Sequence, residues 1–134
     1  MSPSKRTGSA TYPFRIKRVY APFDAGDGFR VLVDRLWPRG IAKENAHIDL
    51  WLKEVAPSNA LRRRAHADAT TWNATTWDAF VADYGRELAQ EPARSAALSL
   101  RERVHQEPVM LLHAARDEIH NNAVALRHWL ETAI

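Results

Sequence analysis

The fold of this chain is organised around residues 30–40, which read Arg-Val-Leu-Val-Asp-Arg-Leu-Trp-Pro-Arg-Gly. Residues 31–33 form a short apolar run rich in β-branched side chains, which is typical of a strand buried on both faces. Pro38 has no backbone N–H and Gly40 permits a turn, so the strand must end before them. Because ligands bind at the carboxyl ends of strands in open α/β sheets, this end is the first candidate site. The side chains delivered there are Asp34, Arg35, Trp37 and Arg39.

The composition is that of one ordinary globular domain. The chain has 134 residues, of which 46% are hydrophobic and 26% charged. No apolar run approaches the roughly 20 residues of a membrane span, and no secretory signal is visible. The absence of cysteine excludes disulfides, thiolate zinc sites and a cysteine nucleophile. We expect a cytoplasmic protein with a disordered tail at residues 1–12 and a single α/β domain at residues 13–134.

The positive charge of the chain comes mainly from arginine. Nineteen Lys and Arg residues oppose sixteen Asp and Glu, and fifteen of the nineteen are arginine. Arginine suits bidentate capture of carboxylate or phosphate, although a GC-rich genome would produce the same bias. The one basic cluster is residues 62–64, and a nucleic-acid binder usually has a longer basic stripe. Nucleic acid is therefore a weak candidate partner.

Hydrophobic periodicity predicts strands that alternate with helices. Strands are expected at residues 14–20, 29–34 and 109–112. Helices are expected at residues 48–55, 59–66 (with Ser58 as N-cap), 77–89, 93–105 and 119–132. Residues 70–79 nearly repeat Thr-Thr-Trp-Asn-Ala as Thr-Thr-Trp-Asp-Ala, which indicates a small insertion around residues 72–76. Strands separated by helices favour parallel pairing, so the sequence predicts a small three-layer α/β sandwich with a short, mostly parallel sheet and helices on both faces.

A second polar stretch follows the last predicted strand. If the strands at 29–34 and 109–112 are parallel neighbours, this stretch lies at the same sheet edge as residues 34–40. It also leads into a helix, whose amino end favours anions. A histidine there could move a proton near neutral pH. The candidate residues of this stretch are His113, Arg116, Asp117, His120 and Asn121.

Structural roles for the same residues stay open. Asp34 and Arg35 could form a salt bridge with each other, or Asp34 could neutralise Arg116. Asp117 fits the first turn of a helix for dipole reasons alone, and Asn121 could be a helix cap. We predict no metal site, because the cysteine-free chain has no His-x-x-x-His or His-Glu-x-x-His motif. No cofactor is predicted either, since the common nucleotide and dinucleotide motifs are absent.

These stretches carry a resemblance to a known family. Residues 16–20, 30–40, 49–58 and 113–122 resemble the YeaO-like members of the domain of unknown function family 488, and the string Val-Asp-Arg-Leu-Trp-Pro-Arg-Gly is the most specific match. The resemblance covers all of the chain except the tail. It implies a small bacterial-type cytosolic α/β domain and no established activity. Other branches of the family resemble this one with a thiol at the position of His113, and any chemistry of that thiol is excluded here.

The sequence therefore favours a site for an anionic small molecule at the carboxyl edge of the sheet. Arg35, Arg39 and Arg116 would bind the charge, and His120 or His113 would move a proton. Asp34 and Asp117 would orient the arginines, while Trp37 and Asn121 would add ligand contacts. Hydrolysis or transfer on a phosphorylated or carboxylated metabolite is the enzymatic interpretation. The alternative is a non-catalytic binding protein with a protein or nucleic-acid partner; no membrane partner is expected, and the oligomeric state is open.

Overall fold

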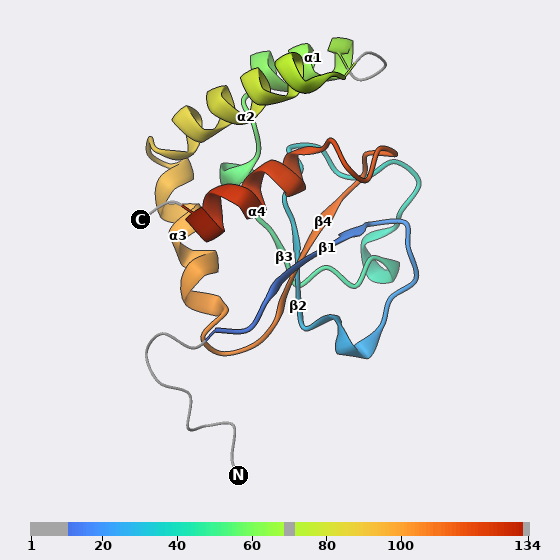
Figure 1. The fold of residues 1–134 in the computed structure, drawn as a ribbon. Helices are drawn as coiled ribbons and strands as arrows, with labels where there is room; N and C mark the ends of the chain where they lie inside the picture. The colour runs from blue at the N-terminus through green and yellow to red at the C-terminus, as the bar shows by residue number, and fades with distance from the viewer. Residues whose placement is uncertain (1–10, 69–71, 133–134) are drawn as a thin grey trace.

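The computed structural model describes residues 11–68 and 72–132 of the chain. The predicted tail at residues 1–12 therefore falls almost wholly outside the described residues, as does part of the near-repeat at residues 70–79. Within the described residues four strands and four α-helices form an α/β fold, in which the helices pack against the sheet (Figure 1). The predicted fold class is confirmed.

The sheet is entirely parallel. It contains β1 (Phe14–Arg18), β2 (Phe29–Leu32), β3 (Leu50–Trp51) and β4 (Val109–His113), in the order β1-β4-β2-β3. All five residues of β4 are buried, as expected for a central strand with an unbroken apolar run. Because β2 pairs directly with β4, the two predicted polar stretches do leave the sheet at the same edge.

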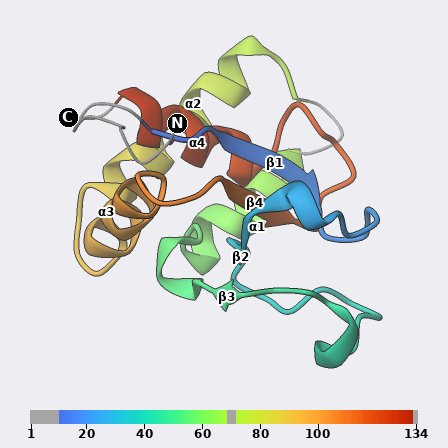
Figure 2. The ribbon, with the colours of Figure 1, turned by 90° about the horizontal axis from the view of Figure 1, so that it is seen from below.

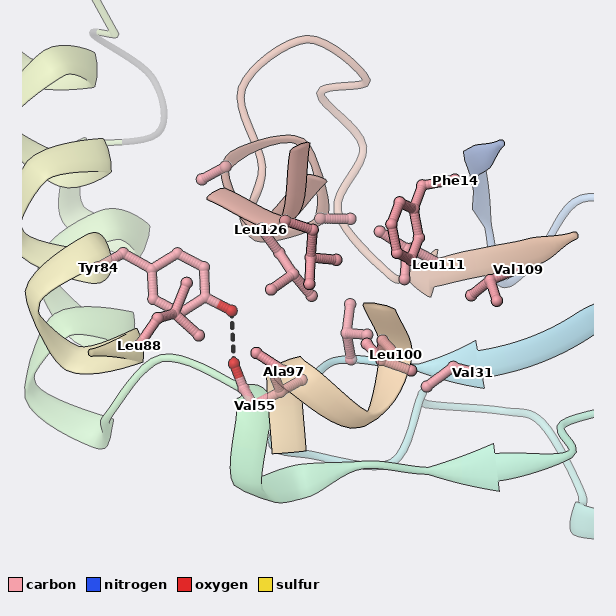
Figure 3. Packing of buried hydrophobic residues seen from close by; sticks show 14 of the residues in the cluster. Phe14, Val31, Val55, Tyr84, Leu88, Ala97, Leu100, Val109, Leu111 and Leu126 are labelled. Atoms are coloured by element: carbon pink, nitrogen blue, oxygen red, sulfur yellow. Dashed lines mark hydrogen bonds between the residues drawn. The ribbon is translucent and has the colours of Figure 1, made fainter. Parts of the chain in front are cut away.

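The α-helices build the main core on one face of the sheet. They are α1 (Asn59–Asp68), α2 (Ala74–Leu88), α3 (Ala93–Arg103) and α4 (Asn122–Thr132). Each helix contributes buried apolar side chains to one cluster with alternate strand residues, because successive side chains of a strand point to opposite faces. Figure 3 shows this packing, with Leu100 and Leu126 near Leu111 of β4 and Leu88 beside Tyr84 of α2.

The other face of the sheet is covered by loops and 3-10 helices. Its smaller cluster is formed by Val19, Leu32, Met110 and Leu112, with Trp37, Ile41, Ile48 and Trp51 packed on it. The 3-10 helices η2 (Ala25–Asp27) and η3 (Lys43–Asn45) belong to this cover. In Figure 2 β3 and its neighbouring loops lie at the edge of the sheet opposite β1, away from α2 and α4. The helical cover predicted for both faces thus consists of α-helices on one face and short 3-10 helices on the other.

A buried ion network lies under this second cover. Asp27 is 3% exposed and pairs with Lys17, at 2.8 Å, and with Arg30. Arg30 also donates to the carbonyls of His47, at 2.6 Å, and Ala46, at 3.4 Å. Its charge is therefore surrounded by acceptors, as a buried guanidinium requires.

The prediction of a helix at residues 48–55 is wrong. This segment instead forms the two-residue strand β3, followed by the 3-10 helix η4 (Lys53–Val55). Trp51 packs into the second-face cluster, whereas its neighbour Leu52 packs against the helix-face core. Consecutive side chains on opposite faces are the pattern of a strand, and pairing with Val31 and Leu32 of β2 gives its backbone hydrogen-bond partners.

Local capping decides the other helix boundaries. Ser58 caps α1 as predicted, since its Oγ accepts a hydrogen bond of 3.1 Å from Leu61 N. Helix α2 begins three residues earlier than predicted because Asn73 and Thr76 form a reciprocal capping box. Helix α4 begins at Asn122 rather than at residue 119. Its first turn is fixed by Asn121, whose Oδ1 accepts from Val124 N at 2.9 Å.

Candidate functional site

A pocket of about 380 Å³ lies where β2 and β4 end. Its walls come from five parts of the chain: the turn after β1, the loop after β2, helix α1 with Pro57 before it, the two residues after β4, and the first residue of α4. The lining residues are Tyr20, Asp34, Arg35, Leu36, Trp37, Pro38, Arg39, Pro57, Arg62, His66, Ala114, Ala115 and Asn122. The predicted site residues Asp34, Arg35, Trp37 and Arg39 are therefore together in one pocket.

The loop after β2 is held in shape by its own side chains. The indole of Trp37 donates to the carbonyl of Ile41 at 2.6 Å, which closes the turn that contains Pro38 and Gly40. Gly40 has φ +83°, a conformation that favours glycine, as the predicted turn requires. The indole of Trp51 donates to the carbonyl of Asp34 at 2.8 Å and so ties this loop to β3. The pocket wall is thus built by short local contacts.

Asp34 joins the two strand ends. One of its carboxylate oxygens accepts from Ala114 N at 2.9 Å, and the other accepts from Asn122 Nδ2 at 3.1 Å. Burial raises the pKa of Asp34, and the two hydrogen bonds partly offset this effect. Among the described residues Asp34 forms no ion pair with Arg35 or Arg116, so neither predicted salt bridge is present. Within the fold, the carboxylate of Asp34 accepts hydrogen bonds from two uncharged N–H groups, one of Ala114 and one of Asn122.

Three guanidiniums line the pocket without a carboxylate partner in the described part of the chain: Arg35, Arg39 and Arg62. Arg35 donates from Nε to the carbonyl of Pro57 at 2.9 Å and from Nη2 to that of Ala56 at 3.1 Å. Carbonyls fix its position but leave its charge uncompensated. Arg62 is half-buried, and its Nε is buried without a hydrogen-bond partner. The pocket therefore has a positive wall.

Two aromatic side chains, Tyr20 and Trp37, contribute to the less polar part of the lining. Tyr20 donates from its hydroxyl to the carbonyl of Arg39 at 2.8 Å, and the guanidinium of Arg18 lies 5.1 Å from its ring centroid. Trp37 packs edge-on against Trp51, with 5.3 Å between ring centroids. Both rings are half-buried or exposed and are held in place by neighbours.

His113 is buried on the helix side of the sheet, apart from the pocket lining. It is 1% exposed, and its Nδ1 has no hydrogen-bond partner. Burial, and secondarily the charge of Arg18, lowers the pKa of His113 to about 4. The ring is therefore neutral at pH 7. It is poorly placed for the predicted proton transfer on a ligand in this pocket.

The rest of the β4–α4 loop uses its polar groups to bind itself. Asp117 Oδ1 accepts from the backbone N–H groups of Ile119 and His120, both at 2.9 Å, and these bonds help to lower the pKa of Asp117. The His120 ring lies 3.1 Å from Asp117 Oδ2 and packs against Trp77. Asn121 is buried as the cap of α4 and donates to the carbonyl of Asp117 at 2.9 Å. Of the two alternatives for Asn121, capping is the role that the geometry shows.

Arg116 is exposed and does not line the pocket. The structure thus places the five predicted residues of this second polar stretch, His113 at the end of β4 included, outside the pocket that holds the four from the loop after β2.

Comparison with known proteins places the chain in a family. A family model described as "Inactive DUF488-N3 subclade" matches residues 13–134. The chain belongs to the DUF488 family. It is 40% identical over 116 residues to "Uncharacterized protein YeaO" of Escherichia coli (strain K12), which covers 87% of this chain and 95% of that protein. It is 39% identical over 103 residues to "Uncharacterized protein Rv3073c" of Mycobacterium tuberculosis (strain ATCC 25618 / H37Rv), covering 76% and 83% of the two chains. No solved structure matches it significantly.

The family resemblance inferred from the motifs is thereby confirmed. In this DUF488 chain the specific string at residues 33–40 supplies most of one pocket wall. Within residues 11–68 and 72–132 no group of three or more His, Asp or Glu side chains could hold a metal ion. None of the helices described is long and apolar enough to cross a membrane.

Sequence reasoning missed two pocket residues on α1, Arg62 and His66. Arg62 was visible only as part of the basic cluster at residues 62–64. The spacing i, i+4 places both residues on one face of a helix, whereas Arg63 points elsewhere and does not line the pocket. That spacing was a usable signal, but it did not show that α1 lies beside the loop after β2. Tyr20 was also missed, because its contact with Arg39 joins elements far apart in sequence.

Proposed function

We propose that this DUF488 protein is a non-catalytic binding protein that holds an anionic ligand in the pocket at the carboxyl edge of its sheet. The observation that carries the proposal is the group of three guanidiniums, Arg35, Arg39 and Arg62, without an ion-pair partner among the described residues. Guanidiniums bind carboxylate or phosphate through paired, charge-assisted hydrogen bonds.

Asp34 is the one carboxylate among the described lining residues, and it forms no ion pair with these guanidiniums. Both oxygens of Asp34 are engaged by Ala114 and Asn122, and burial raises the pKa of Asp34. Two backbone carbonyls fix the guanidinium of Arg35. Because this side chain is already in position, it loses little conformational entropy when a ligand binds. His66 adds an imidazole with hydrogen-bonding nitrogens to the lining.

The non-catalytic part of the proposal rests on the family description and on the pocket lining. The matching family model is described as inactive. Among the described residues, the lining includes no Ser, Thr or Lys, and His113 and His120 are not part of it. Hydrolysis and transfer, the enzymatic interpretations of the sequence, therefore have little support.

The first test measures binding of inorganic phosphate and sulfate to the purified chain by thermal shift and calorimetry at constant ionic strength. A ligand of the native state raises the melting temperature by mass action. Arg39→Ala and Arg62→Ala should each lower the affinity about tenfold or more, since one charge-assisted hydrogen bond contributes about 1.5 kcal/mol or more. Arg39 is exposed, so its loss should change stability little.

Arg63→Ala is the matched control, because Arg63 neighbours Arg62 on α1 but is exposed and lies outside the pocket lining. It should bind phosphate like the unaltered chain. Equal loss in Arg63→Ala and Arg62→Ala, or no binding by the unaltered chain, would overturn the proposed site. Release of nitrophenol from p-nitrophenyl phosphate, abolished by Arg39→Ala, would instead overturn the non-catalytic assignment.

A further inference from the structure

The candidate pocket has two chemically different parts. Its positive wall carries three guanidiniums, but more than half of its lining residues are apolar or aromatic: Tyr20, Leu36, Trp37, Pro38, Pro57, Ala114 and Ala115. A bare inorganic anion would use only the positive wall and would leave the apolar lining exposed to water. Burying that lining is favourable roughly in proportion to its area, so the complementary ligand has an apolar body as well as a charge.

The aromatic residues indicate the shape of that body. Trp37 cannot turn freely, because its indole N–H is bonded to Ile41 and its ring packs against Trp51. Tyr20 is fixed in the same way through its hydroxyl and through Arg18. Fixed rings lose little entropy when a flat ligand packs on them, and they favour offset stacking or edge contacts. The pocket wall thus suits a planar ring better than a flexible chain.

The positive wall indicates the charge of the ligand. One carboxylate carries a single negative charge and has two oxygens, whereas three uncompensated guanidiniums present more positive charge and more donors. A phosphate monoester carries about −1.5 to −2 at pH 7 and has three acceptor oxygens. It therefore matches the three arginines more closely. The volume of about 380 Å³ also lies in the usual range for small-molecule sites, about 300 to 1,000 Å³.

We infer that the ligand is a phosphate monoester of a planar aromatic or heteroaromatic body, with its phosphate on Arg35, Arg39 and Arg62 and its ring against Trp37 and Tyr20. This inference rests on the proposed anion site and adds the chemical class of its ligand.

The experiment compares four probes by calorimetry with the full chain: inorganic phosphate, methyl phosphate, phenyl phosphate and benzoate. Phenyl phosphate should bind about tenfold or more tightly than methyl phosphate, because stacking on aromatic side chains contributes this much for a single ring. Benzoate should bind more weakly than phenyl phosphate, since it has the ring but a smaller charge. Trp37→Leu should reduce the ratio of phenyl phosphate to methyl phosphate affinity. Trp37→Phe lacks the same indole N–H and should restore that ratio, which separates the ring from the hydrogen bond to Ile41.

The outcomes separate this inference from the proposed function. If inorganic phosphate binds but phenyl phosphate binds no more tightly than methyl phosphate, the aromatic class is wrong and the anion site stands. If benzoate equals phenyl phosphate, the requirement for a phosphate is wrong. If no phosphate binds, the anion site itself fails. The comparison of probes on the unaltered chain decides the first two cases even if Trp37→Leu does not fold, and Tyr20→Leu provides a second variant at an exposed ring.

Discussion

The loop after β2 and the loop after β4 leave the sheet at the same edge, yet they use their polar residues in opposite ways. In the first loop Arg35 and Arg39 keep uncompensated charges in the pocket. In the second loop Asp117, His120 and Asn121 bond to one another and to nearby backbone groups. The first loop presents charge to solvent and ligand, whereas the second satisfies its own backbone.

The difference shows that crowding of polar residues in a sequence does not by itself identify a site. The segment between β4 and α4 must supply partners for the free N–H groups of a helix start, and Asn and Asp do this well. The loop after β2 leads to no α-helix and has no such requirement. Its charged side chains are therefore available for binding, and the following predictions test this contrast.

The largest expected effect is at the residue that joins the two loops. Asp34→Ala should lower the free energy of unfolding by about 3 kcal/mol, because Ala114 N loses its acceptor and Asn122 Nδ2 keeps only the carbonyl of Val33, both in a part-buried place. Urea unfolding measures this change. Asp34→Asn keeps one acceptor oxygen, so its free energy of unfolding should fall by clearly less than that of Asp34→Ala. A loss in Asp34→Ala below about 1 kcal/mol would mean that the two loops are held together by other contacts.

The next effect is the pH dependence caused by His113 at the start of the second loop. Its pKa in the folded chain, about 4, lies below the ordinary value of 6.5, so the unfolded chain binds this proton more readily. The contribution of the neutral His113 ring to the free energy of unfolding is therefore fully present above pH 6.5 and is lost as the pH falls toward 4. Between about pH 7 and about pH 5 the loss should reach about 2 kcal/mol.

Unfolding curves of the unaltered chain and His113→Leu check this prediction, since other titrating groups contribute to both. Burial raises the pKa of Asp34, so protonation of Asp34 stabilises the fold as the pH falls toward its ordinary value of 3.8. This effect opposes that of His113, and the pH range of the comparison therefore ends at about pH 5. A direct NMR titration of the His113 ring provides a measurement that needs no variant. A ring that protonates near pH 6.5 would show that His113 is accessible to solvent and would reopen a role for it in the site.

The smallest effect should come from the cap of α4. Asn121→Ala should lower the free energy of unfolding by about 1 kcal/mol and leave phosphate affinity unchanged. Asn73→Ala, which removes the cap of α2 away from the pocket, is the matched control and should show the same pattern. If Asn121→Ala weakened phosphate binding as much as Arg39→Ala, the second loop would belong to the site after all.

Most of the fold could be predicted from local patterns. The apolar run of β4, the periodicity of α2 and the cap at Ser58 are all visible in the sequence, and the structure confirms them. The segment at residues 48–55 could not be assigned, because a short apolar run fits a helix or a buried strand equally well. Its state was decided by the free edge of β2, which offered its backbone a partner 19 residues away in sequence.

The sequence by itself determined that this is a cysteine-free α/β domain of the DUF488 family, with arginines and a tryptophan at the carboxyl end of a core strand. Strand, turn and cap signals are local, so neighbouring residues are enough to specify them. Only the tertiary structure decided which polar residues share a pocket. Helix α1 brings Arg62 and His66 beside the loop after β2, while burial and capping remove His113 and Asn121 from it. These outcomes depend on contacts between distant elements, which no local pattern records.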